Sequence, residues 1–199
     1  MIYIFGDSHA NLNMKGFSKE HINLYHNSVT MHRIGRDNQI VNFNSNMNNE
    51  NNIFILFYGE VDCRCHIYKQ LQLGRELDEI IESLIDSYFK TISNTITKYN
   101  KIIIGSITPP VNKEWHESIN GPTTHEFPIL DTDSNRVKYT QLMNKKLEEY
   151  CLKYNYKYLD TYNNYSDNNG LLITNKSDNN VHILDNSYIH LKLIYLIHI

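Results

Sequence analysis

The sequence lacks the features that mark membrane, secreted and nucleic-acid-binding proteins. No apolar run reaches the roughly 18 residues that a membrane span needs, and no basic segment precedes the first apolar residues, as it would in a signal peptide. The 19 lysine and arginine residues do not exceed the 22 acidic ones, so there is no basic surplus for nucleic acid. We therefore expect a cytoplasmic protein without a nucleic-acid or membrane partner. The composition indicates no particular oligomeric state.

Cysteine is scarce as well. The three residues, Cys63, Cys65 and Cys151, are an odd number, and this suits reduced thiols better than a disulfide framework. Cys63, Cys65 and His66 form a Cys-x-Cys-His cluster, but structural zinc sites usually place paired cysteines two to four residues apart and need a fourth ligand. We expect these thiols to be buried and inert.

Four short apolar runs are present, at residues 2–5, 53–58, 101–107 and 156–161. Because each run is apolar on both faces, we expect strands of a mostly parallel sheet that is covered on both sides. With 199 residues, 41% of them hydrophobic, the chain is long enough for one domain over 1–199. Strands that alternate with helices predict an α/β fold, a three-layer α/β/α sandwich.

Three stretches have the apolar spacing of helices, from Leu77 to Ile96, at about 136–154 and at 185–198. Ser134 or Asp133 is expected as the N-cap of the second. The residues expected on the buried face of the last helix are Tyr188, Leu191, Ile194 and Tyr195.

The chain begins with "MIYIFGDSHANLN", in which an apolar run hands over to Asp7, Ser8 and His9. Two chemistries could begin this way. Asp7 and His9 could be metal ligands, since "GDSHAN" resembles the Asp-x-His opening of calcineurin-like metallophosphoesterases. That family also needs Asn-His-Asp/Glu and Gly-His-x-His blocks, and neither is present to complete a two-metal site.

Alternatively, Ser8 could be a nucleophile at the end of a strand. A serine hydroxyl needs a histidine to take its proton, preferably one that a carboxylate orients. Near the C-terminus the chain reads "SDNNVHILDNSYIHL", where His182 follows Asp178 by four positions. The sequence therefore supplies what a serine nucleophile requires.

Three short motifs in this order resemble the SGNH (GDSL-type) hydrolase family: "FGDSH" near the start, "ITPP" after the third apolar run, and "VHILDNSY" before the last helix. The resemblance implies a flavodoxin-like sandwich, Ser8 as nucleophile, His182 as general base and Asp178 as its orienting acid. It also implies that no metal or organic cofactor takes part.

Two departures from the family pattern are visible. The family's acid lies three residues before its histidine, where this chain has Asn179, so Asp178 requires a longer loop, or a backbone carbonyl assists a Ser–His pair. "GEVD" at 59–62 has Val61 where the family has an oxyanion-binding asparagine. We expect Arg64, held by Glu60, to supply a donor in its place.

For the oxyanion hole the candidates are therefore Ser8, Gly35 and Arg64, with Gly35 contributing a backbone N–H. The segment 109–130 has little regular pattern and is expected as a lid or substrate wall, with Trp115 and His116 stacking on the substrate. Gly59 is assigned to the same substrate-binding wall.

These features predict an SGNH-like serine esterase. A small-molecule or glycan ester is the expected partner, and carbohydrate O-acetyl or O-acyl groups are the substrate class that the resemblance favours. Acyl transfer would use the same nucleophile and base. The alternatives are a degenerate SGNH-fold protein that binds a glycan without turnover and a calcineurin-like metallophosphoesterase.

Overall fold

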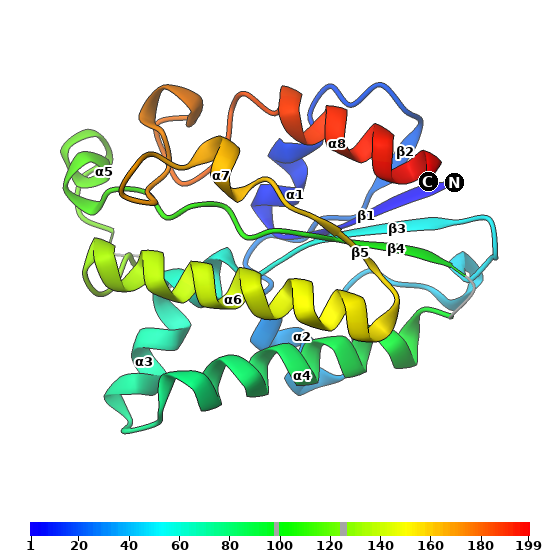
Figure 1. Cartoon of the computed structure of the whole chain (residues 1–199), viewed down its shortest axis with the longest axis horizontal. Coiled ribbons are helices and arrows are strands. Elements are labelled where there is room, and N and C mark those ends of the chain that lie inside the picture. Colours follow the sequence, from blue (N-terminus) through cyan, green and yellow to red (C-terminus); the bar gives the residue numbers. More distant parts are fainter. Residues whose placement is uncertain (98–99, 124–126) are drawn as a thin grey trace.

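The chain forms a five-stranded sheet in which all neighbouring strands are parallel (Figure 1). The computed structural model describes residues 1–97, 100–123 and 127–199. The strand order is β2-β1-β3-β4-β5. The strands are β1 (Ile2–Gly6), β2 (His21–Asn23), β3 (Ile53–Phe57), β4 (Lys101–Gly105) and β5 (Lys157–Leu159). The four predicted strands and the α/β class are confirmed, and β2 is an addition that the sequence did not indicate.

Helices cover both faces of the sheet (Figure 1). One face carries α2 (Met31–Asp37), α3 (Ile67–Gln72), α4 (Leu77–Thr95) and α6 (Asp133–Tyr154). The other face carries α1 (Ser8–Asn13), α7 (Tyr162–Tyr165) and α8 (Ser187–His198). Short elements in the connections are the 3-10 turns η1 (Ser45–Met47) and η3 (Thr174–Lys176), the π-helical turn η2 (Asp62–His66) and the helix α5 (Lys113–Asn120). Among the described residues, no helix has both the length and the hydropathy to cross a bilayer.

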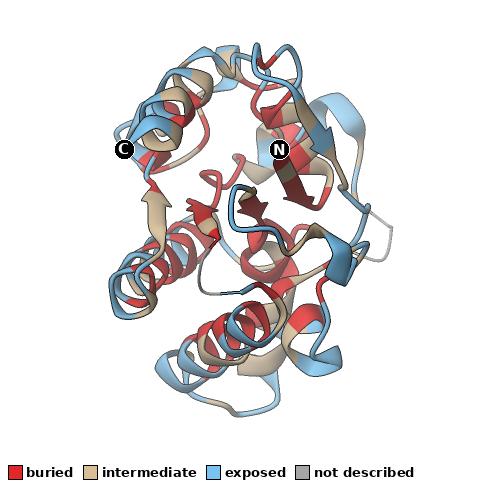
Figure 2. Cartoon of the chain, turned by 90° about the vertical axis from the view of Figure 1, so that its right-hand side faces the viewer, coloured by how far each residue is buried: buried red, intermediate tan, exposed pale blue. Residues whose placement is uncertain are grey.

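The core divides into two layers because side chains alternate along each strand. Phe54 and Leu56 of β3 pack on the side of α4 and α6, whereas Ile55 and Phe57 pack on the side of α1 and α8. Figure 2 shows buried residues along the strands and on the helix faces that point toward the sheet. The continuous apolar runs of the sequence therefore reflect burial from both sides.

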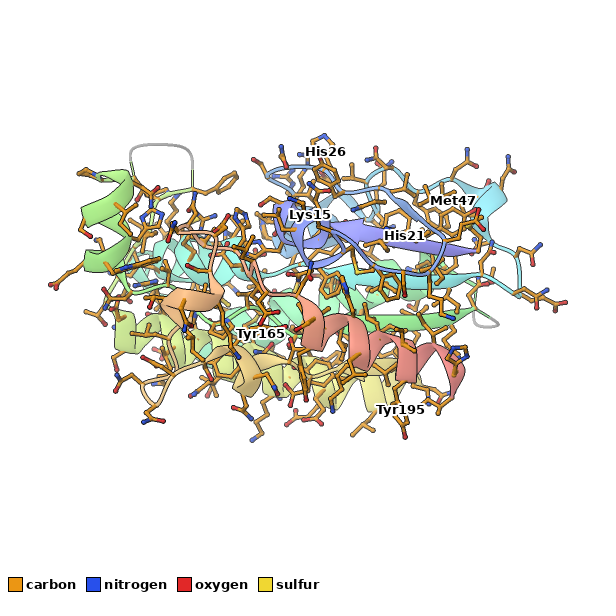
Figure 3. The ribbon with its side chains drawn as sticks, turned by 90° about the horizontal axis from the view of Figure 1, so that it is seen from above. Lys15, His21, His26, Met47, Tyr165 and Tyr195 are labelled. Atoms are coloured by element: carbon orange, nitrogen blue, oxygen red, sulfur yellow. The ribbon has the colours of Figure 1, made fainter. Side chains whose placement is uncertain are left out.

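Two helix predictions need correction. The N-cap of α6 is Thr132, whose hydroxyl accepts from the backbone N–H of Asn135 at 3.2 Å, while Asp133 is the first helical residue. Helix α8 buries Ile189 and Leu193. Its predicted face was wrong in part, since Leu191 is 65% exposed and Tyr195, which points to the edge of the molecule in Figure 3, is 64% exposed.

Strand β2 positions the loop that follows it. The backbone N–H groups of Leu24 and His26 donate to the carbonyls of Ile4 and Gly6, at 2.8 and 2.9 Å, so pairing with β1 continues past β2. The chain leaves β1 toward β2 on one side and reaches β3 on the other. The strand order therefore reverses between β1 and β3, and crevices at such points bind ligands in open α/β sheets.

Candidate active site

Ser8 lies where β1 ends and α1 begins. Asp7 caps α1, because its Oδ1 accepts from the backbone N–H of His9 at 2.9 Å. Ser8 is the first residue of the helix, where backbone N–H groups lack an intrahelical acceptor. The strand-to-helix turn thus presents both the hydroxyl and the backbone of Ser8 at the carboxyl edge of the sheet.

His182 and Asp178 complete a hydrogen-bonded chain with Ser8. Nε2 of His182 lies 2.9 Å from Oγ of Ser8, and Nδ1 of His182 lies 2.8 Å from Oδ2 of Asp178. Although burial raises the pKa of Asp178, its hydrogen bonds from the ring and backbone of His182 hold it below its ordinary value. The structure therefore brings together all three residues predicted to be catalytic.

A compact loop accounts for the four-residue spacing between the acid and the histidine. Asp178 accepts from the backbone N–H groups of Asn180 and His182 through Oδ1, at 2.9 and 3.2 Å. Its own N–H donates to the carbonyl of His182 at 3.1 Å. Asn179 takes a left-handed conformation with φ of 65°, which asparagine tolerates. This extra residue turns away and leaves Asp178 facing the imidazole.

Helix α5 supports this loop from behind. Trp115 packs with Val181 in a small apolar cluster, and Nε2 of the buried His116 lies 2.9 Å from Oδ1 of Asn180. The amide of Asn120 donates to the carbonyl of Asn179 at 2.8 Å. In Figure 1, α5 and the segment between α7 and α8 lie at the same end of the molecule. Trp115 and His116 are therefore placed against the loop, and the prediction that they face the substrate needs correction.

The cavity at Ser8 has a volume of about 440 Å³. Its described lining residues are Asp7, Ser8, Asn27, Ser28, Val61, Arg64 and Phe127. Val61 stands in the wall, as the sequence predicted, with no polar atom in its side chain. The predicted lid segment 109–130 includes residues 124–126, which lie outside the described residues; Phe127 is its contribution to this wall.

Arg64 reaches the cavity from η2. Its Nε lies 2.9 Å from Oε1 of Glu60, and its Nη1 donates to the carbonyl of Phe127 at 2.7 Å. The predicted contact with Glu60 is confirmed. Two anchors at different nitrogens fix the plane of the guanidinium beside Ser8.

Two glycines predicted for the site lie elsewhere. Gly35 is inside α2, where a Cβ would come within 2.3 Å of Oγ of Ser87 on α4, so its small size serves helix packing. Gly59 has φ of 112°, and a Cβ there would lie 2.7 Å from Ile107. It makes the turn after β3. Neither glycine is among the described residues that line the cavity.

Sequence reasoning missed Asn27 and Ser28, which line the same cavity as Val61. Ser28 has a left-handed backbone with φ of 65°, in the loop that β2 aligns with the end of β1. No local pattern marks these residues, because long-range pairing between two strands sets their position. Asn27 and Ser28 line the cavity, whereas Gly35, which was predicted to contribute a backbone N–H there, does not.

A buried set of charges lies beneath the serine. Nδ1 of His9 is 3.0 Å from Oδ1 of Asp7, and its Nε2 is 3.2 Å from the carbonyl of Val181 and 3.9 Å from Oε2 of Glu60. Burial lowers the pKa of His9, but Asp7 and Glu60 outweigh it and raise the value to about 9. Both ring nitrogens of His9 face protein groups, so Asp7 and His9 do not offer the paired ligands that the metal interpretation requires.

Asp62 of η2 fixes α2 against the end of β3. Its carboxylate accepts from the backbone N–H groups of Met31 and His32, at 2.7 and 3.2 Å. Burial raises the pKa of Asp62 to about 7, although these two hydrogen bonds lower it. The three cysteines are free and buried, as predicted, and burial raises the pKa of Cys65 to about 11.

Comparison with known proteins finds similarity in structure alone. No family model matches the chain, and no curated protein matches its sequence. A GDSL-like lipase from Bacteroides thetaiotaomicron has a TM-score of 0.62 and 13% identity, over 99% of this chain and 87% of that one. A protein assigned as an acylhydrolase from Bacteroides fragilis has a TM-score of 0.64 and 14% identity, over 99% and 86%.

The OSK domain of Drosophila Oskar is also similar, with a TM-score of 0.58 and 12% identity over 97% of this chain and 86% of that one. The identities are low throughout, so the likeness concerns the arrangement of the chain. In that arrangement it extends over nearly all of the 199 residues. The chain has the fold of the SGNH (GDSL-like) hydrolases.

Proposed function

We propose that this protein is a serine hydrolase that cleaves esters, with O-acetyl or other O-acyl groups of carbohydrates as its substrate class. The observation that carries the proposal is the continuous hydrogen-bonded chain from Asp178 through His182 to Ser8. A serine, a histidine and a carboxylate in this order form an activated nucleophile on unrelated folds.

In the proposed reaction, Oγ of Ser8 attacks the ester carbonyl while Nε2 of His182 takes the hydroxyl proton. Asp178 accepts from Nδ1–H, which keeps the tautomer that leaves Nε2 free to act as a base. His182 then returns the proton to the leaving alcohol. A water molecule, deprotonated by the same nitrogen, hydrolyses the acyl-serine and restores the hydroxyl.

The developing oxyanion requires donors on the cavity side of Ser8. The backbone N–H of Ser8 is one, and the guanidinium of Arg64 is the charged donor in the same cavity. The guanidinium is already held by Glu60 and Phe127, so little rearrangement is needed when charge appears. A carbohydrate ester suits a cavity of about 440 Å³ whose walls include Asn27, Ser28 and Arg64.

The test is hydrolysis of p-nitrophenyl acetate and bis-p-nitrophenyl phosphate, with and without EDTA, by the native chain and by Ser8→Ala. We expect EDTA-resistant cleavage of the acetate, and a loss of at least about 10³-fold in Ser8→Ala. Thr174→Ala serves as the control for a hydroxyl away from the cavity. Phosphate cleavage that EDTA abolishes would contradict the proposal. Acetylated xylan and acetylated hexosamines then test the sugar class.

Val61 favours a second candidate, a protein of this fold that binds a glycan ester without turnover. Loss of one oxyanion donor typically costs about 10²–10³ in rate. If Arg64 does not compensate, the native chain and Ser8→Ala will bind an acetylated sugar equally, and neither will release acetate. Calorimetric titration with acetate assay of the same samples separates this candidate from the first.

A further inference from the structure

A second cavity, of about 340 Å³, lies next to the one at Ser8. The two share Ser28 and Phe127 as lining residues, so a common wall separates them. Its basic and imidazole side chains are His32, Arg33, Arg36, His66 and Lys69. Three are cationic and two are imidazoles, and no carboxylate occurs among the described residues that line this cavity. We call it the basic cavity.

The positive charge of the basic cavity is not a consequence of composition, since the whole chain carries a net charge of −3. Asp37 pairs with the two arginines, at 3.6 Å from Nε of Arg33 and 2.7 Å from Nε of Arg36. Lys69 has no ion-pair partner among the described residues. One carboxylate against three cations leaves a local excess that a bound anion would neutralise.

The two imidazoles make this cavity more than a solvated basic surface. The rings of His32 and His66 stack with centroids 4.3 Å apart and planes at 30°. Their backbones belong to α2 and η2, and the carboxylate of Asp62 holds α2 through the N–H of His32 at 3.2 Å. Two half-buried rings are thus fixed among cations, in a place where a positive charge on either ring is disfavoured.

Protonation follows the same pattern. Burial, His32, Lys69 and Arg75 together lower the pKa of His66 to about 4, and burial and Arg36 lower that of His32. At neutral pH both rings are neutral and each can donate one N–H. An anion in the cavity would add a favourable charge and oppose these shifts, which couples binding to proton uptake.

We propose that the basic cavity binds a phosphate group carried by the ester substrate, next to the acyl group held at Ser8. Asp37 already accepts from Nε and Nη2 of Arg36. The other guanidinium N–H groups of the two arginines, the ammonium of Lys69 and the imidazole N–H groups would donate to the several acceptor oxygens of a phosphate. Because Ser28 and Phe127 line both cavities, the cavities are neighbours, and one small molecule is expected to place a group in each. The substrate class becomes a phosphorylated alcohol, such as a sugar phosphate, that bears an O-acyl group.

This inference rests on the proposed function, so binding is measured apart from catalysis. Inorganic phosphate is titrated by calorimetry into the native chain and Ser8→Ala at constant ionic strength, since salt screens such sites. We expect equal affinity in these two, and about tenfold weaker binding by Lys69→Gln or Arg36→Gln, equivalent to about 1.4 kcal/mol. Lys138→Gln, which removes a cation from the exposed side of α6, should bind like the native chain.

The catalytic arm compares kcat/KM for an acetyl ester of glycerol 3-phosphate with that for glycerol monoacetate. We expect the ratio to fall about tenfold in Lys69→Gln and to be unchanged in Lys138→Gln. Thermal melting of each variant checks that it is folded. Equal phosphate binding by Lys69→Gln and the native chain would overturn the inference, as would equally tight binding of acetate.

The two arms separate the two proposals. Phosphate binding that depends on Lys69, with no ester cleavage that depends on Ser8, supports the basic cavity and contradicts the hydrolase. Ester cleavage that depends on Ser8, with no preference for the phosphorylated substrate, supports the hydrolase and contradicts phosphate binding in the basic cavity.

Discussion

The structure contains two pairs of neighbouring imidazoles, and the pairs differ in the charges around them. In one pair the rings of His9 and His182 are 4.6 Å apart, and each has a carboxylate within 3.0 Å, Asp7 and Asp178 respectively. In the other pair the rings of His32 and His66 are 4.3 Å apart, and their charged neighbours are mainly cations. We call these the acidic-side pair and the basic-side pair.

The comparison shows that neighbouring charges can outweigh burial. Burial lowers the pKa of an imidazole in both places. His9 nevertheless has a pKa raised to about 9 by two carboxylates, while burial, together with His32, Lys69 and Arg75, lowers the pKa of His66 to about 4. At neutral pH the same residue type is therefore a cation at His9 and a neutral ring at His66.

The largest effect is expected from removing the carboxylate that orients His182. Asp178→Asn should lower kcat for ester hydrolysis by about 10³–10⁴, because an amide cannot hold the Nδ1–H tautomer. KM should change little. The measurement is steady-state hydrolysis of p-nitrophenyl acetate, with Asp86→Asn, which removes the carboxylate paired with Lys90 on α4, as the control.

A double variant sharpens this prediction. Asp178→Asn/Asn179→Asp moves the carboxylate to the position that the SGNH pattern favours. Asn179 has a left-handed backbone and its side chain has no contact with the ring of His182 among the described hydrogen bonds. We expect the double variant to hydrolyse the ester as slowly as Asp178→Asn. Recovery of the native rate would show that the carboxylate can act from position 179 as well as from position 178.

The second prediction concerns the stability that His9 contributes. Its pKa in the folded state lies above the unfolded value, so its contribution is complete below about pH 6.5 and disappears as pH rises through about 9. The difference between the folded pKa of about 9 and the unfolded pKa of 6.5 corresponds to about 3 kcal/mol of unfolding free energy. His9→Gln should be less stable than the native chain by about this amount at pH 6, because Asp7 and Glu60 lose the cation between them. Urea unfolding from pH 6 to pH 9.5 measures it.

The matched control is His198→Gln, on the exposed end of α8. Asp62 adds a separate pH dependence. Because its pKa is raised in the folded state, its contribution to stability is lost as pH rises from about 4 to about 7, and this loss should also be seen in His9→Gln. An unfolding free energy of the native chain that is flat between pH 6.5 and 9 would contradict the assignment of a charged His9.

Residues 2–8 and 178–182 show what sequence could predict. The apolar runs marked the buried strands, and Ser8, Asp178 and His182 were predicted to lie together, as their hydrogen bonds in the structure show. These signals are local, because a strand buried on both faces must be apolar, and a nucleophile needs a base of a particular type. Strand β2 escaped prediction because "HIN" has one apolar residue, and its pairing with β1 makes it a strand.

The cavity wall formed by Asn27 and Ser28 depends on contacts between residues far apart in the sequence. Gly35 was chosen for its residue type, yet α2 packs it against Ser87. Asn27 and Ser28 reach the cavity through the alignment of β2 with β1, and His32 meets His66 through the attachment of α2 to Asp62. No spacing along the chain encodes these distances.

The smallest effect is expected in the basic-side pair. Because the pKa of His66 lies below its unfolded value, its contribution to stability is present above about pH 6.5 and is lost as pH falls toward 4. His66→Phe keeps an aromatic ring against His32 but removes the titrating group. When pH falls from 7.5 to 5, the unfolding free energy of His66→Phe should decrease by about 1 kcal/mol less than that of the native chain. This value is reduced because His66 is partly exposed to solvent. Urea unfolding at the two pH values measures this, with His198→Phe as the control. Equal losses in His66→Phe and the native chain would mean that burial and the nearby cations do not hold His66 neutral, and the contrast between the two pairs would then rest on His9 alone.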